Sequence, residues 1–307
     1  MRYRKGSLAR WSGRAYGFSE GVRGLPQPLR KPNWFKINRL AVGDRASSVL
    51  GIVAEHGLHT VCSSAACPNK GTCFAEGTAT FMILGDICTR ACRFCNIETG
   101  RPLQEDLQEG ERLADAAVRM GLKFVVVTSV CRDDLPDEGA GAFARSVRAL
   151  RERIPEVRVE VLAPDFSGRR ECLEVVLQAR PHVFNHNLET VERLTPRIRT
   201  KARYHRSLSV LEMVRNMVPG LPTKSGLMVG LGETRQELKQ AWNDLAGAGV
   251  QRLTIGQYLQ PTRTHHPVER YVEPEEFVEM REEAKAAGIS AVLSGPLVRS
   301  SYHAGTL

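Results

Sequence analysis

Short apolar runs alternate with longer amphipathic stretches along most of the chain. The runs favour strands of a parallel sheet, which are buried on both faces, and the stretches repeat apolar residues at the helical period. Strands are predicted at residues 80–84, 123–128, 157–162, 182–185, 226–229 and 252–255. Helices are predicted at residues 46–56, 105–120, 140–153, 170–179, 209–218, 235–248 and 274–287. Strands that alternate with helices in this way predict an α/β protein.

The order of these elements favours a parallel sheet with right-handed crossovers, either doubly wound or curled into a full or partial (β/α) barrel. In a barrel, the loops that follow the strands form the catalytic face. Thr128 and Ser129 end the second predicted strand, and Asn187 and Glu189 follow the fourth. These polar residues are therefore candidates for ligand binding.

Composition places the chain among globular proteins. It has 307 residues, of which 42% are hydrophobic and 25% are charged. No run of 18 apolar residues is present, and the first residues contain Arg and Trp where a secretory signal has an apolar segment. We therefore expect a cytoplasmic protein that neither binds nor crosses a membrane.

The net charge of +9 is concentrated at one end of the chain. Residues 1–39 contain ten Lys and Arg residues against the single acid Glu20, and the remaining 268 residues carry 33 basic and 33 acidic side chains. Such an arm suits a solvated tail, a contact with an acidic partner or a targeting peptide. The balanced charge of the body does not favour a nucleic-acid partner.

Cysteine is the most informative residue type. Six of the eight cysteines lie between positions 62 and 95. A disulfide framework is not expected in a long chain without a secretory signal, so the cluster indicates metal ligands. A structural zinc site usually has two short Cys pairs, and only Cys92 and Cys95 have the C-x2-C spacing.

The second cysteine triplet has the spacing C-x3-C-x2-C, formed by Cys88, Cys92 and Cys95, and follows the first predicted strand. Three thiolates hold three irons of a [4Fe–4S] cubane, which normally takes four ligands. One iron then stays open to a small molecule, which suits redox chemistry on a bound ligand.

This spacing, with Phe94 beside the last cysteine, resembles the radical S-adenosylmethionine (SAM) superfamily. The resemblance implies that SAM binds the open iron and is cleaved by one electron. The 5′-deoxyadenosyl radical then abstracts a hydrogen atom from an unactivated carbon. The resemblance also makes Gly230 and Gly232, with Glu233 beside them, a turn that contacts SAM. Without it, a G-x-G turn at a strand end is weak evidence, because glycines are common there.

The first triplet, Cys62, Cys67 and Cys73, has the spacing C-x4-C-x5-C and resembles the auxiliary-cluster motif of the lipoyl synthase family. The resemblance extends over residues 31–307, including the stretches at 31–34, 127–136, 187–190, 230–233, 258–263 and 299–302. It implies a second [4Fe–4S] cluster held by the three cysteines and by Ser301, with Ser300 as the alternative ligand. An alkoxide is a hard ligand for iron, so the iron it holds should be labile, which suits a cluster that donates sulfur.

The family implies a partial (β/α)6 TIM-like barrel at residues 81–307, with an auxiliary iron–sulfur segment at 40–80 and the C-terminal tail packed at one end. It also implies insertion of two sulfur atoms at C6 and C8 of a protein-bound octanoyl group. The expected partners are an octanoylated lipoyl-carrier domain or glycine-cleavage H protein, an electron donor of ferredoxin or flavodoxin type, and an iron–sulfur carrier. A different sulfur-inserting radical enzyme and a zinc-containing nucleic-acid module are the alternatives.

Overall fold

The computed structural model describes residues 29–35, 44–64, 67, 69, 73, 79–305 and 307. Most of the predicted basic arm, at residues 1–28 and 36–39, lies outside the described residues. So does most of the segment between Cys62 and residue 79.

An eight-stranded sheet forms the centre of the described structure, with the strand order β1-β2-β5-β6-β7-β8-β9-β10. Its strands are β1 (His59–Thr60), β2 (Thr80–Ile83), β5 (Phe124–Ser129), β6 (Arg158–Leu162), β7 (Val183–Asn185), β8 (Thr223–Val229), β9 (Arg252–Gln257) and β10 (Ala291–Gly295). Neighbouring strands are parallel except for β1, which pairs with β2 in the antiparallel direction. All six predicted strands are confirmed, and β1 and β10 are additional strands of the sheet.

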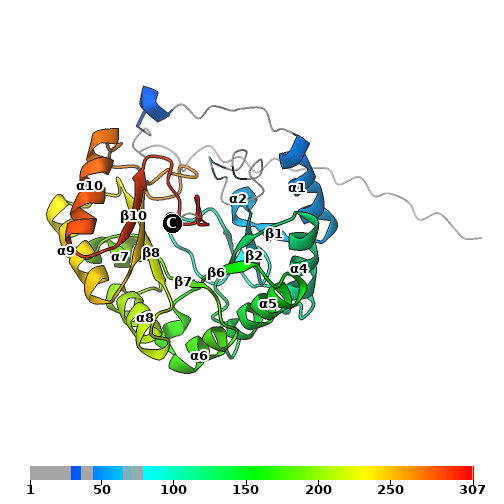
Figure 1. Ribbon diagram of the computed structural model, residues 1–307. Helices are drawn as coiled ribbons and strands as arrows, with labels where there is room; N and C mark the ends of the chain where they lie inside the picture. Colours follow the sequence, from blue (N-terminus) through cyan, green and yellow to red (C-terminus); the bar gives the residue numbers. More distant parts are fainter. Residues whose placement is uncertain are drawn as a thin grey trace, which may run out of the picture.

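The long helices lie outside the curved sheet (Figure 1). They are α1 (Asp44–Glu55), α4 (Glu109–Arg119), α5 (Ala140–Arg153), α6 (Arg170–Gln178), α8 (Tyr204–Met217), α9 (Arg235–Gly247) and α10 (Pro274–Ala286). Shorter helices are η1 (Asn33–Phe35), α2 (Val61–Ser64), η2 (Phe166–Gly168), η3 (Glu192–Leu194) and α7 (Thr195–Ile198). No helix in the described part of the chain is long and apolar enough to span a membrane.

The strand order confirms the predicted partial barrel. From β2 to β10 the parallel strands follow one another in chain order, without the reversal that defines a doubly wound sheet. The sheet curls into an open ring with β1 and β10 at its two free edges (Figure 1). Six helices, from α4 to α10 without α7, connect these strands and give the predicted (β/α)6 repeat, which β10 ends.

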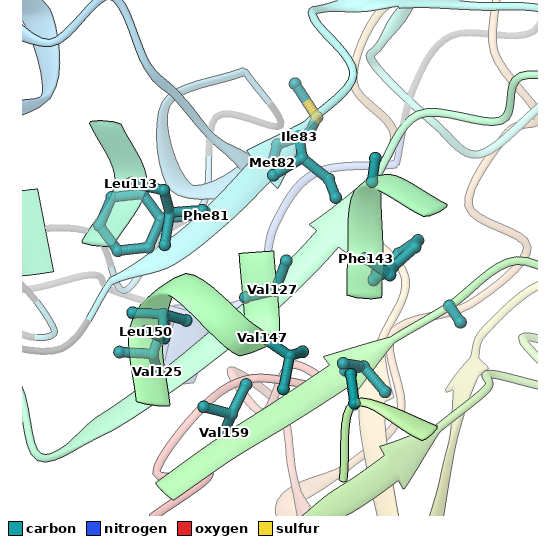
Figure 2. Close-up of a cluster of buried hydrophobic side chains, with 14 of the residues drawn as sticks. Phe81, Met82, Ile83, Leu113, Val125, Val127, Phe143, Val147, Leu150 and Val159 are labelled. Carbon is teal, nitrogen blue, oxygen red and sulfur yellow. The ribbon is translucent and has the colours of Figure 1, made fainter. Parts of the chain in front are cut away.

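The core between sheet and helices is built from the predicted apolar positions. Figure 2 shows Phe81 beside Leu113 of α4, and Val147 of α5 above the strands that carry Val127 and Val159. Each of these side chains is almost completely buried. Burial of such side chains stabilises the fold by roughly 1.5–3 kcal/mol each. The packing fixes the strand ends from which the site is built.

The interior of the barrel contains a buried polar group on three neighbouring strands. The Lys224 ammonium lies 3.0 and 3.1 Å from the two carboxylate oxygens of Glu160, and Asn185 donates to the same carboxylate at 2.8 Å. All three residues are fully buried. The charges compensate one another, so the group fills the interior without an unpaired ion.

Candidate active site

The loop that carries Cys88, Cys92 and Cys95 leaves the carboxyl end of β2, where barrel enzymes place their active sites. Two short strands, β3 (Ile87–Cys88) and β4 (Glu98–Thr99), pair with each other and fold the loop back. His265, in the connection that follows β9, hydrogen-bonds the carbonyl of Cys95 through Nε2 at 2.9 Å. The loop is therefore fixed at both ends of the triplet.

A buried ion-pair network around Arg90 holds the cysteine loop. The Arg90 guanidinium lies 2.6 Å from Asp133 and 2.7 Å from Asp165, and its side chain is only 5% exposed. Burial acts to raise the pKa of Asp133, but hydrogen bonds and charge from Arg90 lower that pKa to about 2. Asp133 also accepts from the hydroxyl of Thr89 at 2.9 Å. Arg90 therefore anchors the loop to the ends of β5 and β6.

The three thiols of the loop differ in their electrostatic environment. Burial raises the pKa of Cys92 and raises the pKa of Cys95 to about 12, and the charges of neighbouring cysteines contribute to both shifts. The pKa of Cys88 is lowered by a hydrogen bond from Cys131. Burial disfavours negative charge at Cys92 and Cys95 in the absence of a cation, and metal ligation supplies that cation.

The ligand arrangement matters for the kind of metal. Among the described residues, no three His, Cys, Asp or Glu side chains converge closely enough to hold a single metal ion. A cubane is different, because its three cysteines bind three separate irons and need not converge on one point. The absence of a single-ion site among the described residues is therefore compatible with a cluster held by Cys88, Cys92 and Cys95.

Two buried polar atoms beside the loop have no hydrogen-bond partner among the described residues: Ser129 Oγ and Asn187 Oδ1. Unpaired buried polar atoms are costly, and a ligand that pairs with them would remove this cost. Both belong to residues predicted to bind the cofactor. Thr128, by contrast, donates its hydroxyl to the carbonyl of Leu162 at 2.8 Å and is engaged within the sheet.

Glu189 lies at the carboxyl end of β7 in a strained conformation, with φ at +67°. A residue other than glycine in this region costs roughly 1–3 kcal/mol, and such residues cluster at functional sites. Asn187 donates to its carboxylate at 3.0 Å. Burial raises the pKa of Glu189, while Arg199 acts to lower it. The charges of Glu189 and Arg199 also influence the pKa of Cys92. The backbone N–H of Arg93 donates to the carbonyl of Ile198 at 2.9 Å, so the chain at Arg199 passes beside the cysteine loop.

Gly230 and Gly232 form a turn after β8, and Gly230 is also tightly packed within the protein. Both have positive φ, at +91° and +99°. A Cβ on Gly230 would lie 2.2 Å from Gln257 Nε2 and 2.5 Å from the carbonyl oxygen of Arg270. Glu233 accepts from the backbone N–H of Gly230 at 2.6 Å and thereby holds the turn. Packing thus excludes a side chain at Gly230, and the contact of this turn with SAM stays a prediction.

Phe94 lies between Cys92 and Cys95 and is partly buried against the core formed by the second half of the barrel. Its neighbour Arg93 donates its N–H to the carbonyl of Ile198 at 2.9 Å. The aromatic side chain therefore fastens the cysteine loop to the opposite side of the barrel mouth.

The first cysteine triplet is tied to the same end of the barrel. Cys62 lies in α2 and is buried, as is Cys73. Asn96, one residue after Cys95, donates to the carbonyl of Ser64 at 3.0 Å. Asn69 donates to the carbonyl of Leu297 in the C-terminal tail at 2.6 Å. These two hydrogen bonds join the first triplet, the cysteine loop and the tail.

The tail crosses the barrel mouth after β10. Gly256 of β9 lies so close to it that a Cβ would be 2.1 Å from the carbonyl oxygen of Val298. Arg299 follows, and burial lowers its pKa while the charge of Cys67 acts to raise it. Among the described residues, no carboxylate lies within ion-pair distance of Arg299. Ser300 and Ser301 come next and are partly buried in a series of turns.

Sequence reasoning missed three residues of this site: Arg90, Arg199 and Cys131. Arg199 is 7% exposed and donates to the carbonyl of Leu188 at 3.1 Å and to the hydroxyl of Ser207 at 3.0 Å. No carboxylate in the described part of the chain pairs with it within 4.0 Å. The sequence signal was only a basic stretch after residue 195, which resembles an ordinary solvated surface.

Comparison with known proteins agrees with this geometry. Residues 82–245 match the family model described as "Radical SAM superfamily". Methylornithine synthase has a similar fold, with a TM-score of 0.54, 11% identity, and coverage of 84% of this chain and 83% of that one. SuiB of Streptococcus suis bound to S-adenosylmethionine has the same TM-score at 10% identity, over 74% of this chain and 54% of that one. Fold and cysteine loop together define a radical SAM enzyme, with a [4Fe–4S] cluster and SAM as cofactors.

Relatives in sequence narrow the assignment. The chain is 54% identical to the lipoyl synthase of Methylococcus capsulatus, over 90% of this chain and 86% of the relative. It is 52% identical to the lipoyl synthase of Halalkalibacterium halodurans, over 90% of this chain and 91% of the relative. The chain belongs to the lipoyl synthase family and is a radical SAM sulfurtransferase.

Proposed function

We propose that Cys88, Cys92 and Cys95 hold the [4Fe–4S] cluster that cleaves SAM, and that the first triplet holds a second cluster. The observation that carries this proposal is the convergence of both triplets and the tail on one end of the barrel. When bound, the cluster of Cys88, Cys92 and Cys95 would supply an electron to SAM. The cluster of the first triplet would supply sulfur. The protein holds both groups, orients the substrate between them and excludes water.

In this proposal the SAM site uses the unpaired groups beside the cysteine loop. Arg199 faces the carboxylate of SAM, because its guanidinium is buried without an acidic partner. Ser129 and Asn187 contribute the buried oxygens that lack partners. Further residues line or shape the site: Glu189, Phe94, Thr128 and the turn formed by Gly230, Gly232 and Glu233.

For the second cluster we propose Cys62, Cys67, Cys73 and a serine ligand, Ser301, with Ser300 as the alternative. The half-buried guanidinium of Arg299, which has no carboxylate partner among the described residues, supports this placement. The charge of Cys67 acts to raise the pKa of Arg299, and a negatively charged thiolate cluster there would compensate the guanidinium. The hydrogen bond from Asn69 to Leu297 brings the tail to the cysteine segment.

The proposed substrate is an octanoyl group on a lipoyl-carrier domain or glycine-cleavage H protein, which receives sulfur at C6 and C8. Single-electron chemistry requires a donor, for which we propose a ferredoxin or flavodoxin. A cluster that gives up sulfur has to be rebuilt, for which we propose an iron–sulfur carrier. The cytoplasmic location stays a prediction.

The metal content of the purified protein tests the proposal. Anaerobically purified protein should be brown and contain about eight irons per chain, as two cubanes require. About four irons would leave only one cluster and would contradict the second site. A colourless, zinc-containing protein would contradict both.

A further inference from the structure

A series of buried hydrogen bonds ends at the Arg199 guanidinium. Arg199 follows α7 and lies beside the cysteine loop, because the carbonyl of Ile198 accepts from the backbone N–H of Arg93 at 2.9 Å. Its Nη1 donates to the Ser207 hydroxyl at 3.0 Å and to the carbonyl of Leu188 at 3.1 Å. Both bonds use Nη1, and among the described residues no acceptor is bonded to Nη2 or Nε. These two nitrogens are therefore available to a ligand.

The Ser207 hydroxyl is in turn bonded to a buried histidine. Ser207 lies in the first turn of α8 and is fully buried. His186, directly after β7, is also buried, and its Nε2 lies 2.9 Å from Ser207 Oγ. Its other ring nitrogen, Nδ1, lies 2.8 Å from the carbonyl oxygen of Ala163, directly after β6. The series thus links Arg199 to the ends of two neighbouring strands.

The carbonyl of Ala163 sets the direction of the hydrogen bonds in this series. A carbonyl oxygen only accepts, so Nδ1 of His186 carries the proton that it donates. Burial lowers the pKa of His186 to about 4, so the ring is neutral at pH 7 and its Nε2 is an acceptor. The Ser207 hydroxyl then donates to Nε2 and turns its lone pairs toward Arg199. A guanidinium has only donors, so this orientation of the hydroxyl is the one that suits it.

We propose that Ser207, oriented by His186, is a positioning residue that holds the Arg199 guanidinium toward the carboxylate of SAM. The inference rests on the proposed function, which places Arg199 opposite that carboxylate. An arginine side chain has many rotamers, and ordering it costs free energy when a ligand binds. A guanidinium that is already held through Nη1 avoids most of this cost and presents its remaining donors to the ligand.

The test measures the dissociation constant of SAM by anaerobic equilibrium dialysis of the full chain with both clusters. No reductant is added, so that SAM is bound and not cleaved. Ser207→Ala should raise the constant about tenfold, the lower end of what loss of a hydrogen bond to a charged group causes. His186→Phe keeps a ring but offers Ser207 no acceptor, so it should weaken binding in the same direction. An unchanged constant in either variant would overturn the inference and leave the proposed function intact.

A double variant separates positioning from a general effect on the site. Because Ser207 acts through Arg199, Ser207→Ala should have no further effect on SAM binding in an Arg199→Met background. A further tenfold weakening there would overturn the inference, since Ser207 would then act independently of Arg199. If Arg199→Met alone binds SAM as tightly as the unchanged chain, the proposed role of Arg199 fails first and this inference with it.

Ser146→Ala is the matched control. Ser146 is also a buried serine of a long helix, and its hydroxyl donates to the carbonyl of Ala142 within α5 at 2.9 Å. The dissociation constant of SAM in this variant should equal that of the unchanged chain. Equal weakening by Ser146→Ala and Ser207→Ala would assign the effect to the loss of any buried hydroxyl and would overturn the inference.

Discussion

At the scale of single residues, the buried pair of Arg90 and Asp133 predicts a pH-dependent contribution to stability. The folded pKa of Asp133, about 2, lies below its ordinary value of 3.8. A depressed carboxylate pKa stabilises the fold above the unfolded pKa, and this stabilisation is lost as pH falls toward the folded value. The contribution at neutral pH is at most about 2 kcal/mol.

Asp133→Asn should therefore lower the free energy of unfolding of the cluster-free protein more at pH 7 than at pH 3. Urea titrations at the two values measure the difference. Asp106→Asn is a suitable control, because that carboxylate is about half exposed and its ion pair with Arg112 is screened by solvent. Equal destabilisation by Asp133→Asn at both pH values would show that the ion pair is not what the side chain contributes.

Sequence analysis identified the residues whose role can be recognised from their spacing along the chain. It missed the residues whose role depends on neighbours that are distant in the sequence. Cys88, Cys92 and Cys95 are identifiable because three thiols within eight positions have few structural uses. Cys131 is 43 positions from Cys88, and only the pairing of β2 with β5 brings the two together. Gly230 shows the same limit: a Cβ there would lie 2.2 Å from Gln257 Nε2, a packing contact that the G-x-G spacing does not reveal.

At the scale of elements, the close contact between β9 and the C-terminal tail should make the enzyme sensitive to one added methyl group at Gly256. A Cβ at Gly256 would meet backbone atoms of Val298, which cannot move aside as a flexible side chain can. Gly256→Ala should displace the tail that carries Arg299 and Ser301. Lipoyl formation should then fall about a hundredfold, because small displacements at a reacting centre have effects of this size, while SAM cleavage persists.

Gly51→Ala provides the control. Gly51 is exposed within α1, and a Cβ there meets nothing within 4 Å. In this variant the free energy of unfolding should rise by roughly 0.5–1 kcal/mol, so that it unfolds at a higher urea concentration. Its activity should be unchanged. Parallel loss of SAM cleavage and lipoyl formation in Gly256→Ala would mean that the methyl group disrupts the barrel as a whole.

The predicted helices and strands agree best with the structure where the apolar residues repeat regularly, and least where the segments are short. Helix α5 and the six predicted strands agree within a few residues. Strand β10 (Ala291–Gly295) was missed because its apolar run of three residues, Ala291 to Leu293, is too short to be distinguished from a loop. Helix α8 begins at Tyr204, five residues before its predicted start, because the polar first turn hides the helical period.

At the scale of the whole molecule, the basic arm is predicted to assist docking of an acidic carrier protein. Phe35 is buried, and its ring centroid lies 5.6 Å from that of Tyr271, just before α10. This contact fastens the end of the arm to the barrel, as Figure 1 shows for η1 and α10. Removal of residues 1–29 should slow modification of the octanoylated carrier and spare a short octanoyl-lysyl peptide.

Ionic strength gives the matching control. Exposed charges are screened beyond about 8–10 Å at physiological salt. Added salt should slow the full chain on the carrier and have little effect on the truncated chain. Equal loss of activity on carrier and peptide after truncation would assign the arm a structural role.

The central claim is that the two cysteine triplets divide the reaction between them. The most direct test measures 5′-deoxyadenosine and lipoyl product in the same anaerobic assay for two triple variants. Replacement of Cys88, Cys92 and Cys95 by Ala should abolish both products. Replacement of Cys62, Cys67 and Cys73 by Ala should leave 5′-deoxyadenosine measurable and abolish the lipoyl product, because no sulfur is available. Lipoyl formation that survives loss of the Cys62 triplet would contradict the account.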